Sequence, residues 1–244
     1  MKAILSDIHS NLEAFQAVLE DISQKDVDEI YCLGDVVGYG SNPRECLSIA
    51  RDFQVIIRGN HESALFQKTD KFNPKAKRAI EWTREQLLQE DGVIDYVKQL
   101  SDFTDVEGVM CVHGSPLDPI SEYIVPAYAA EKKRLKKIFE FIPNFCFVGH
   151  THIPGIFTDD LSFTPQKDLF GNLYMLEPGK EKAIINVGSV GQPRDGDPRA
   201  CYVTFDGDSV VYRRVEYDIE KAAKKIFSVT SLDDSLGRRL ISGR

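Results

Sequence analysis

The sequence has no long hydrophobic run. None of its apolar stretches approaches the roughly 18 consecutive residues that a membrane-spanning helix needs. The first ten residues, MKAILSDIHS, also have neither a long apolar core nor a signal-peptide cleavage site. We therefore expect no interaction with a membrane, and we expect the N-terminus to form a first strand.

Paired cysteines are also missing. The chain has 5 cysteines, an odd number, and none of them forms a CxxC pair. This pattern is not typical of a disulfide framework or of a closed structural zinc site. Most of the five lie within apolar runs, where a free cysteine acts as a small hydrophobic residue. We expect reduced thiols and a cytoplasmic location. The cysteines are Cys32, Cys46, Cys111, Cys146 and Cys201.

Basic residues are outnumbered by acidic ones. Lysine and arginine total 30 against 38 aspartates and glutamates, which gives a net charge of −8. This balance argues against stable binding to nucleic acid, which needs a positive field. It still allows a small phosphorylated substrate, because bound metal cations can reverse the local field. One basic run, 131–137, is interpreted as a solvated helix face or as a docking patch for nucleotide or nucleic acid. Nothing in the sequence indicates the oligomeric state.

Short apolar runs alternate with helical patterns in the first half of the chain. Leu12, Phe15, Val18, Leu19 and Ile22 have the spacing of an amphipathic helix, with Ser10 as its predicted cap in a capping box. This alternation is typical of an α/β protein. The predicted strands are Lys2–Leu5, Glu29–Leu33, Phe53–Ile57, Val109–Val112 and Phe145–Val148, and further helices are predicted over Arg44–Ala50, Pro74–Glu90 and Pro126–Phe141.

The second half is richer in strands. A hairpin turn is predicted at 205–208, where Asp206 and Gly207 lie between two apolar runs. A short helix from Asp218 and a polar tail would end the chain. There is no repeat or linker, so we expect a single domain over residues 1–244. The predicted strands are Gly155–Phe157, Leu173–Leu176, Ala183–Val187 and Tyr202–Glu216.

The ends of the predicted strands share one feature. Each apolar run in the first half is followed closely by Asp, Asn or His, in most cases next to a glycine. The carboxyl edge of an open α/β sheet is where ligands bind, so these side chains should meet. All 5 histidines lie at such positions, a pattern that independent core or surface histidines would not produce. They are His9, His61, His113, His150 and His152.

Imidazole, carboxylate and amide groups together suit divalent first-row metals such as Mn, Fe, Zn, Co or Ni. The series Asp7-x-His9, Gly34-Asp35, Gly59-Asn60-His61-Glu62, His113 and Gly149-His150-x-His152 resembles the calcineurin-like metallophosphoesterase superfamily. The segment 186–194, NVGSVGQPR, is similar to a small prokaryotic phosphodiesterase-like branch of that superfamily.

The resemblance implies a four-layer α/β/β/α sandwich, in which two mixed sheets are flanked by helices. It implies one metal held by Asp7, His9 and His152, and a second held by Asn60, His113 and His150. Asp35 would bridge the two metals, of which manganese is the expected identity. His61 would be catalytic and face the substrate instead of binding metal.

This arrangement implies hydrolysis of a phosphodiester, a small phosphorylated metabolite or a nucleotide. A hydroxide bridging the two metals would attack phosphorus in line, and His61 would protonate the leaving oxygen or stabilise its charge. Glu62 would orient a neighbouring histidine or would be an exposed acid.

Two further residues are candidates for contact with substrate. Tyr39 lies in a Gly-rich segment and would stack on a leaving group, or its segment is only a turn. Arg194 follows a second Gly-rich segment and would bind phosphate, or that segment is only a structural turn.

Differences between this sequence and other members of the superfamily narrow the range of expected activities. Protein phosphatases of the superfamily have Asp-Arg-Gly after the bridging aspartate, whereas Asp35 is followed by Val36-Val37-Gly38. A phosphomonoesterase remains an alternative within the enzyme class. The alternatives from another class are a non-catalytic scaffold or a metal-dependent regulator that binds nucleotide, and the presence of His61 with a full ligand set favours the enzyme.

Overall fold

The computed structural model describes residues 1–69, 72–106 and 108–244 and contains two mixed sheets of six strands each. In spatial order, the first sheet contains β3 (Val55–Ile56), β2 (Glu29–Cys32), β1 (Lys2–Leu5), β11 (Ala200–Phe205), β12 (Ser209–Val215) and β9 (Leu173–Met175). The second contains β4 (Phe103–Val106), β5 (Val109–Val112), β6 (Phe145–Val148), β10 (Ala183–Asn186), β7 (Gly155–Thr158) and β8 (Phe163–Pro165).

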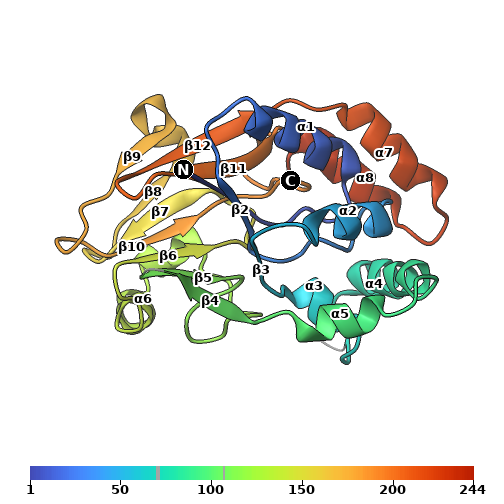
Figure 1. The fold of residues 1–244 in the computed structure, drawn as a ribbon, viewed down its shortest axis with the longest axis horizontal. Coiled ribbons are helices and arrows are strands. Elements are labelled where there is room, and N and C mark those ends of the chain that lie inside the picture. The colour runs from blue at the N-terminus through green and yellow to red at the C-terminus, as the bar shows by residue number, and fades with distance from the viewer. Residues whose placement is uncertain (70–71, 107) are drawn as a thin grey trace.

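Helices surround the two sheets (Figure 1). They are α1 (Leu12–Ser23), α2 (Pro43–Ala50), α3 (Asn60–Ala64), α4 (Pro74–Leu87), α5 (Val93–Gln99), α6 (Lys132–Phe139), α7 (Ile219–Ser228) and α8 (Asp234–Ser242), with 3₁₀ turns at Pro126–Ala129, Gln166–Asp168 and Phe170–Asn172. Within the described residues, no helix has the length and apolar character to cross a bilayer.

Successive side chains of a strand point to opposite faces of its sheet, so the apolar residues fall into separate cores between the sheets and under the helices. Ile4 of β1 lies in the core between the sheets together with Phe147 of β6, whereas Leu5 packs on the other face against Phe15 of α1. On the outer face of the second sheet, Leu135 of α6 packs in a separate cluster that includes residues of β6. These clusters confirm the predicted α/β sandwich of two mixed sheets flanked by helices.

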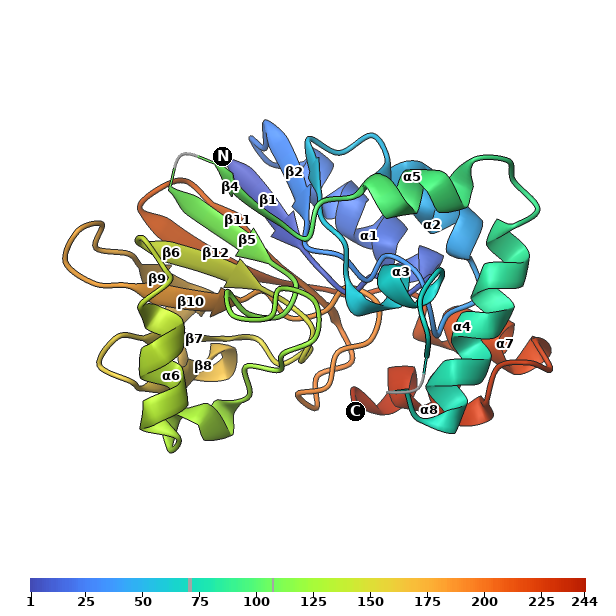
Figure 2. The same ribbon diagram turned by 90° about the horizontal axis from the view of Figure 1, so that it is seen from below.

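Parallel pairing places several strand ends at one edge. In the first sheet, β1 is parallel to β2 and β2 to β3, and in the second, β5 is parallel to β6 and β6 to β10. Figure 2 shows the arrowheads of β1, β5 and β6 pointing toward the same end of the molecule. The loops that leave these strands therefore meet where the two sheets come together.

The predicted cap of the first helix is wrong by one residue. Ser10 has a left-handed backbone with φ of 55° and belongs to the turn after β1. Asn11 is the cap instead, and its side-chain oxygen accepts a hydrogen bond of 3.2 Å from the backbone N–H of Ala14.

Other differences concern short elements. The sequence analysis did not predict α3, α5, β4 or β8, and the single helix predicted over Pro126–Phe141 is a 3₁₀ turn followed by α6. The predicted polar tail contains α8, whose Leu236 and Leu240 are buried with Leu232, just before the helix, in a cluster with residues of α7 and α4.

Candidate metal centre

The residues singled out at the strand ends are buried together at the shared edge of the two sheets. β1 and β2 of the first sheet lead to Asp7, His9 and Asp35, and Asn60 begins α3 just after β3. From the second sheet, β5 leads to His113, and β6 leads to His150 and His152. Every carboxylate and imidazole of this set is at most 4% exposed. The structure therefore brings together side chains that are up to 145 positions apart in the chain.

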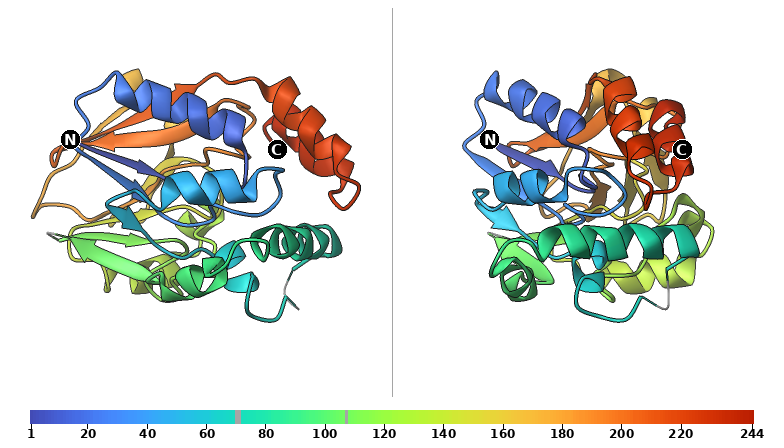
Figure 3. Two further views of the ribbon diagram at one scale, coloured as in Figure 1. Left: turned by 45° about the vertical axis from the view of Figure 1, so that its right-hand side comes forward. Right: turned by 90° about the vertical axis from the view of Figure 1, so that its right-hand side faces the viewer.

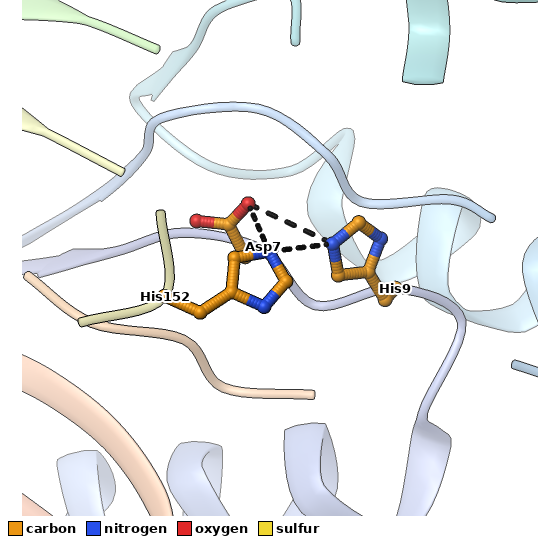
Figure 4. A group of neighbouring side chains, drawn as sticks. All are labelled: Asp7, His9 and His152. Carbon is orange, nitrogen blue, oxygen red and sulfur yellow. Dashed lines mark hydrogen bonds and ion pairs between the residues drawn. The ribbon is translucent and has the colours of Figure 1, made fainter. Parts of the chain in front are cut away.

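Three groups of these side chains could hold metal ions. In each group, one ligand atom per residue lies within 4.8 Å of the others. Figure 4 shows the first group, in which a carboxylate oxygen of Asp7 and ring nitrogens of His9 and His152 converge. Because His9 and Asp35 each belong to two groups, the three form one continuous cluster. The groups are Asp7, His9 and His152; His9, Asp35 and His61; and Asp35, His113 and His150.

Backbone carbonyl groups fix the orientation of four histidines. One ring nitrogen of each donates a hydrogen bond to a carbonyl oxygen, which leaves the other nitrogen unprotonated in the neutral ring and directed at the cluster. The outward contacts are His9 Nδ1 to Val37 O at 3.2 Å, His113 Nδ1 to Leu33 O at 2.8 Å, His150 Nε2 to Ser121 O at 3.2 Å and His152 Nδ1 to Gln192 O at 2.5 Å.

Backbone groups also fix the orientation of the two carboxylates, Asp7 and Asp35. Asp7 Oδ2 accepts a hydrogen bond of 2.9 Å from the backbone of His150, while its Oδ1 has no hydrogen bond and lies 3.1 Å from His152 Nε2. Asp35 Oδ1 accepts a hydrogen bond of 2.8 Å from the backbone of His61. Its Oδ2 lies 3.3 Å from His113 and 3.8 Å from His9. Asp35 therefore directs one oxygen between the two halves of the cluster.

This donor set fits divalent cations. A buried carboxylate oxygen without a hydrogen bond is costly unless a cation neutralises it. Although burial opposes ionisation, the neighbouring His152 keeps the pKa of Asp7 well below its usual range. Burial also opposes protonation of His113, yet Asp35 raises the pKa of this histidine to about 9. The two carboxylates thus favour positive charge in this buried cluster.

Asn60 and His61 complete the cluster from the start of α3. Asn60 Oδ1 lies 3.1 Å from His113 Nε2 and therefore faces the same side as the inward nitrogens. His61 Nδ1 is buried without a hydrogen bond, and Nε2 lies 3.9 Å from Asp35 Oδ2. Burial lowers the pKa of His61 to about 4.

Comparison with known proteins identifies the family. The calcineurin-like phosphoesterase superfamily domain matches residues 1–209. The chain belongs to this superfamily. A protein of Methanocaldococcus jannaschii described as uncharacterized is 39% identical, and the match covers 100% of this chain and 98% of that protein.

Solved structures agree with this assignment to the calcineurin-like phosphoesterases. The crystal structure of a metallophosphoesterase from Sphaerobacter thermophilus is 38% identical, with a TM-score of 0.85 and coverage of 100% of this chain and 98% of that one. A hypothetical protein from Pyrococcus horikoshii shares the fold at 21% identity, with a TM-score of 0.72 and coverage of 100% and 99%.

Glu62 supports the backbone around the cluster. Its buried carboxylate accepts hydrogen bonds from the backbone N–H groups of Asp35 at 2.8 Å, Gly59 at 2.9 Å and Val37 at 3.1 Å. The alternative of an exposed acid is wrong, and these bonds hold backbone instead of a histidine ring. Burial, together with the charge of Asp35, raises the pKa of Glu62 to about 7.

The backbone of the chain is strained around the cluster. Within the described residues, 9 non-glycine residues have a left-handed φ, and 7 of them belong to the loops of the site. Such conformations cost free energy and persist where the surroundings enforce them, as in binding sites. The 7 residues are Asp7, His9, Ser10, Asp35, Tyr39, His150 and His152.

Aromatic residues and one arginine line the mouth of the site. Tyr39 packs against His9 and His61, with ring centroids 4.7 and 4.4 Å apart, and the Arg194 guanidinium lies 6.0 Å from the Tyr39 ring centroid. Tyr123, which the sequence analysis missed, stacks on His150 at 3.7 Å and is 45% exposed. Burial raises the pKa of Tyr39 and Tyr123, and the positive charge of Arg194 opposes both shifts. Arg194 therefore lies between two tyrosines from opposite halves of the site.

Proposed function

We propose that this chain is a hydrolase of phosphodiesters or of small phosphorylated metabolites, nucleotides included, with two divalent metal ions. The observation that carries the proposal is the convergence of ring nitrogens and carboxylate oxygens on one buried cluster. The second nitrogen or oxygen of these side chains is hydrogen-bonded to the backbone, which fixes their orientation. When bound, the two cations would clamp the phosphate and activate a water for in-line attack. The natural metal is proposed to be manganese, with Fe, Ni, Co or Zn as candidates.

The ligands divide between the two cations according to the groups in the structure. Asp7, His9 and His152 would hold one cation, and Asn60, His113 and His150 the other. Asp35 would contact both, which is supported by the position of its Oδ2 between His9 and His113.

His61 would act on the leaving group. Its Nδ1 lacks a hydrogen bond, and its ring packs between Tyr39 and Phe72 at the mouth of the site. Arg194 would neutralise charge on the phosphate, and Tyr39 would contact the leaving group. The ring of Tyr123 would extend this contact on the side of His150.

The chain as a whole would work as one domain. Pairing of β1 with β11 joins the two ends of the sequence in a single sheet. The described cysteines are all free and buried, which supports work in a reducing compartment, the cytoplasm.

The test uses metal-stripped protein with bis-p-nitrophenyl phosphate and p-nitrophenyl phosphate, after addition of Mn, Fe, Ni, Co or Zn. We expect metal-dependent turnover, and the preferred ester separates a diesterase from a monoesterase. His61→Ala should keep two metals per chain and lose about 10²- to 10⁴-fold in kcat. Asp35→Asn should lose both metal and activity. Turnover that does not depend on metal, or a chain that binds no metal, would sink the proposal.

A further inference from the structure

The helical hairpin α7–α8 lies beyond residue 209, where the match to the superfamily domain ends. Figure 3 shows it beside α1, at the same end of the molecule as α2 and α4. Its buried residues form a cluster with Ala79 of α4, and Tyr39 and Trp82 pack on this cluster. The hairpin therefore contacts a residue that lies at the mouth of the site.

A lysine of α7 joins this hairpin to the loop 38–42. Lys225 Nζ lies 2.6 Å from Glu13 Oε1 of α1 and donates a hydrogen bond of 3.1 Å to Asn42 Oδ1. The Glu13 side chain is only 6% exposed, so its charge needs this partner. Lys221 also approaches Glu13, but at 3.5 Å. Lys225 is thus the closer cation and the one that also holds the loop.

The loop 38–42 is attached to the metal-site backbone at two points. The N–H of Gly40 donates to His9 O, and the N–H of Asn42 donates to Ser10 O, each at 3.0 Å. The loop has no regular secondary structure before α2 begins at Pro43. Its position therefore depends on a few hydrogen bonds, one of which is donated by Lys225 of α7.

The end of the hairpin holds the second substrate loop. The carbonyl oxygen of Gly243, just after α8, accepts a hydrogen bond of 2.9 Å from the N–H of Gly196. Gly196 is two residues after Arg194. A side chain at Gly243 would collide with the backbone of Asp197 and Pro198, at 2.9–3.0 Å. The hairpin thus reaches the loops of both Tyr39 and Arg194.

We propose that α7–α8 is a clasp that fixes the two substrate loops, and that Lys225 is the positioning residue that holds Tyr39 in place. This assignment rests on the proposed function for its effect on turnover. Its structural part does not depend on that function, because it rests on the contacts of Lys225 with Glu13 and Asn42 and on the hydrogen bond between Gly196 and Gly243. The clasp contacts none of the proposed metal ligands through Lys225, so metal binding should not depend on it.

Hydrogen–deuterium exchange of full-length Lys225→Met tests the clasp directly. The amides of Gly40 and Asn42 should exchange about tenfold faster than in the unsubstituted protein, because a hydrogen bond to a charged group is lost. Lys225→Arg should restore slow exchange. The matched control is Lys224→Met on the same helix, since the Lys224 side chain is 78% exposed and reaches only Glu220. It should leave both amides unchanged.

A second variant covers the case in which Lys225→Met does not fold. Asn42→Ala keeps the ion pair between Lys225 and Glu13 and removes the contact of Lys225 with the loop, together with the hydrogen bonds of the Asn42 side chain with Ser41 and Glu45. Fluorescence of Trp82, the one tryptophan in the sequence, reports whether the hairpin cluster is intact. Wild-type exchange of Gly40 in folded Lys225→Met or Asn42→Ala, or equally fast exchange in Lys224→Met, would overturn the clasp.

Kinetics separates the clasp from a general structural role. In Lys225→Met we expect KM for the p-nitrophenyl esters to rise several-fold while kcat stays within about twofold and metal content is unchanged, because only the fraction of molecules with a closed loop binds substrate. A fall in kcat with unchanged KM contradicts this role. If the unsubstituted protein hydrolyses no ester, the proposed function fails, while the exchange experiment still decides whether the clasp exists.

Discussion

Nε2 of His9 and Nε2 of His152 lie 3.0 Å apart, although the two residues are separated by 143 positions in the chain. Burial lowers the pKa of both, and each donates its other ring N–H to a carbonyl group. Two unprotonated nitrogens therefore face each other, an arrangement that is repulsive without a cation between them.

A cation should for that reason stabilise the folded protein. At free metal about 100-fold above its dissociation constant, we expect the free energy of unfolding to rise by about 2.7 kcal/mol and Tm by roughly 5–10 °C. Differential scanning calorimetry of stripped and reloaded protein measures this increase. His152→Ala should lose most of the increase. A Tm that none of the five candidate metals raises would contradict the prediction.

Glu62→Gln should destabilise the chain although it changes volume little. The carboxylate accepts three backbone hydrogen bonds, and the amide nitrogen of glutamine cannot accept any of them. We expect a loss of about 2 kcal/mol in the free energy of unfolding, measured by urea denaturation. The control Glu220→Gln, whose side chain is 85% exposed, should be within about 0.5 kcal/mol of the unsubstituted protein.

Gly38→Ala should displace His61 without touching a proposed metal ligand. A Cβ at Gly38 would lie 2.0 Å from His61 Nδ1, and φ at this position is +94°. We expect at least a tenfold lower kcat with normal metal content. Gly207→Ala is the control for backbone strain, because Gly207 has φ of +108° and nothing within 4 Å of its Cβ position. Equal kinetics of the two variants would show that space beside His61 is not limiting.

Tyr202→Phe should weaken the contact between β11 and α1 in a pH-dependent way. Burial raises the pKa of Asp21, but hydrogen bonds from Lys25 and from Tyr202, the latter at 2.5 Å, lower it below its usual value. Stability from a lowered carboxyl pKa is present above the unfolded value of about 3.9 and is lost as the pH falls through the folded value.

The substitution should therefore cost about 1 kcal/mol at pH 7, since Asp21 is partly exposed, and less at pH 3. Urea denaturation at the two pH values measures the difference. A cost that is the same at pH 3 and pH 7 would show that the ionised carboxylate is not involved.

The parts predicted correctly from the sequence have strong local signals. Strands such as Phe145–Val148 are apolar runs followed by Gly and His, and parallel pairing at one edge brings their polar ends together. Five histidines at such positions allow the cluster to be predicted without any coordinates. The roles of Asn60 as a ligand and of His61 as a residue that faces the substrate came only from the family resemblance.

The missed features depend on contacts distant in sequence. Tyr123 is identified only by its stacking on His150, which lies 27 positions away and on another element. The α8 helix did have a signal, since Leu236 and Leu240 within it and Leu232 just before it recur every four residues in a polar segment. The capping position was misplaced because Ser10 and Asn11 both suit a cap, and the left-handed φ that decides between them is imposed by the site.

Asp7 and Asp35 come from one sheet and His113, His150 and His152 from the other, so the candidate centre lies across the seam of the sandwich. Its order of assembly during synthesis follows from this placement. A nascent chain holds Asp7, His9 and Asp35 early, but the first group is incomplete until His152 has left the ribosome. The third group likewise needs His150, so of the three groups only His9, Asp35 and His61 is complete in a chain that ends before β4. Intermediates that contain only β1, β2 and β3 would have to rely mainly on apolar contacts, and a cation shared by both sheets would enter as a late step.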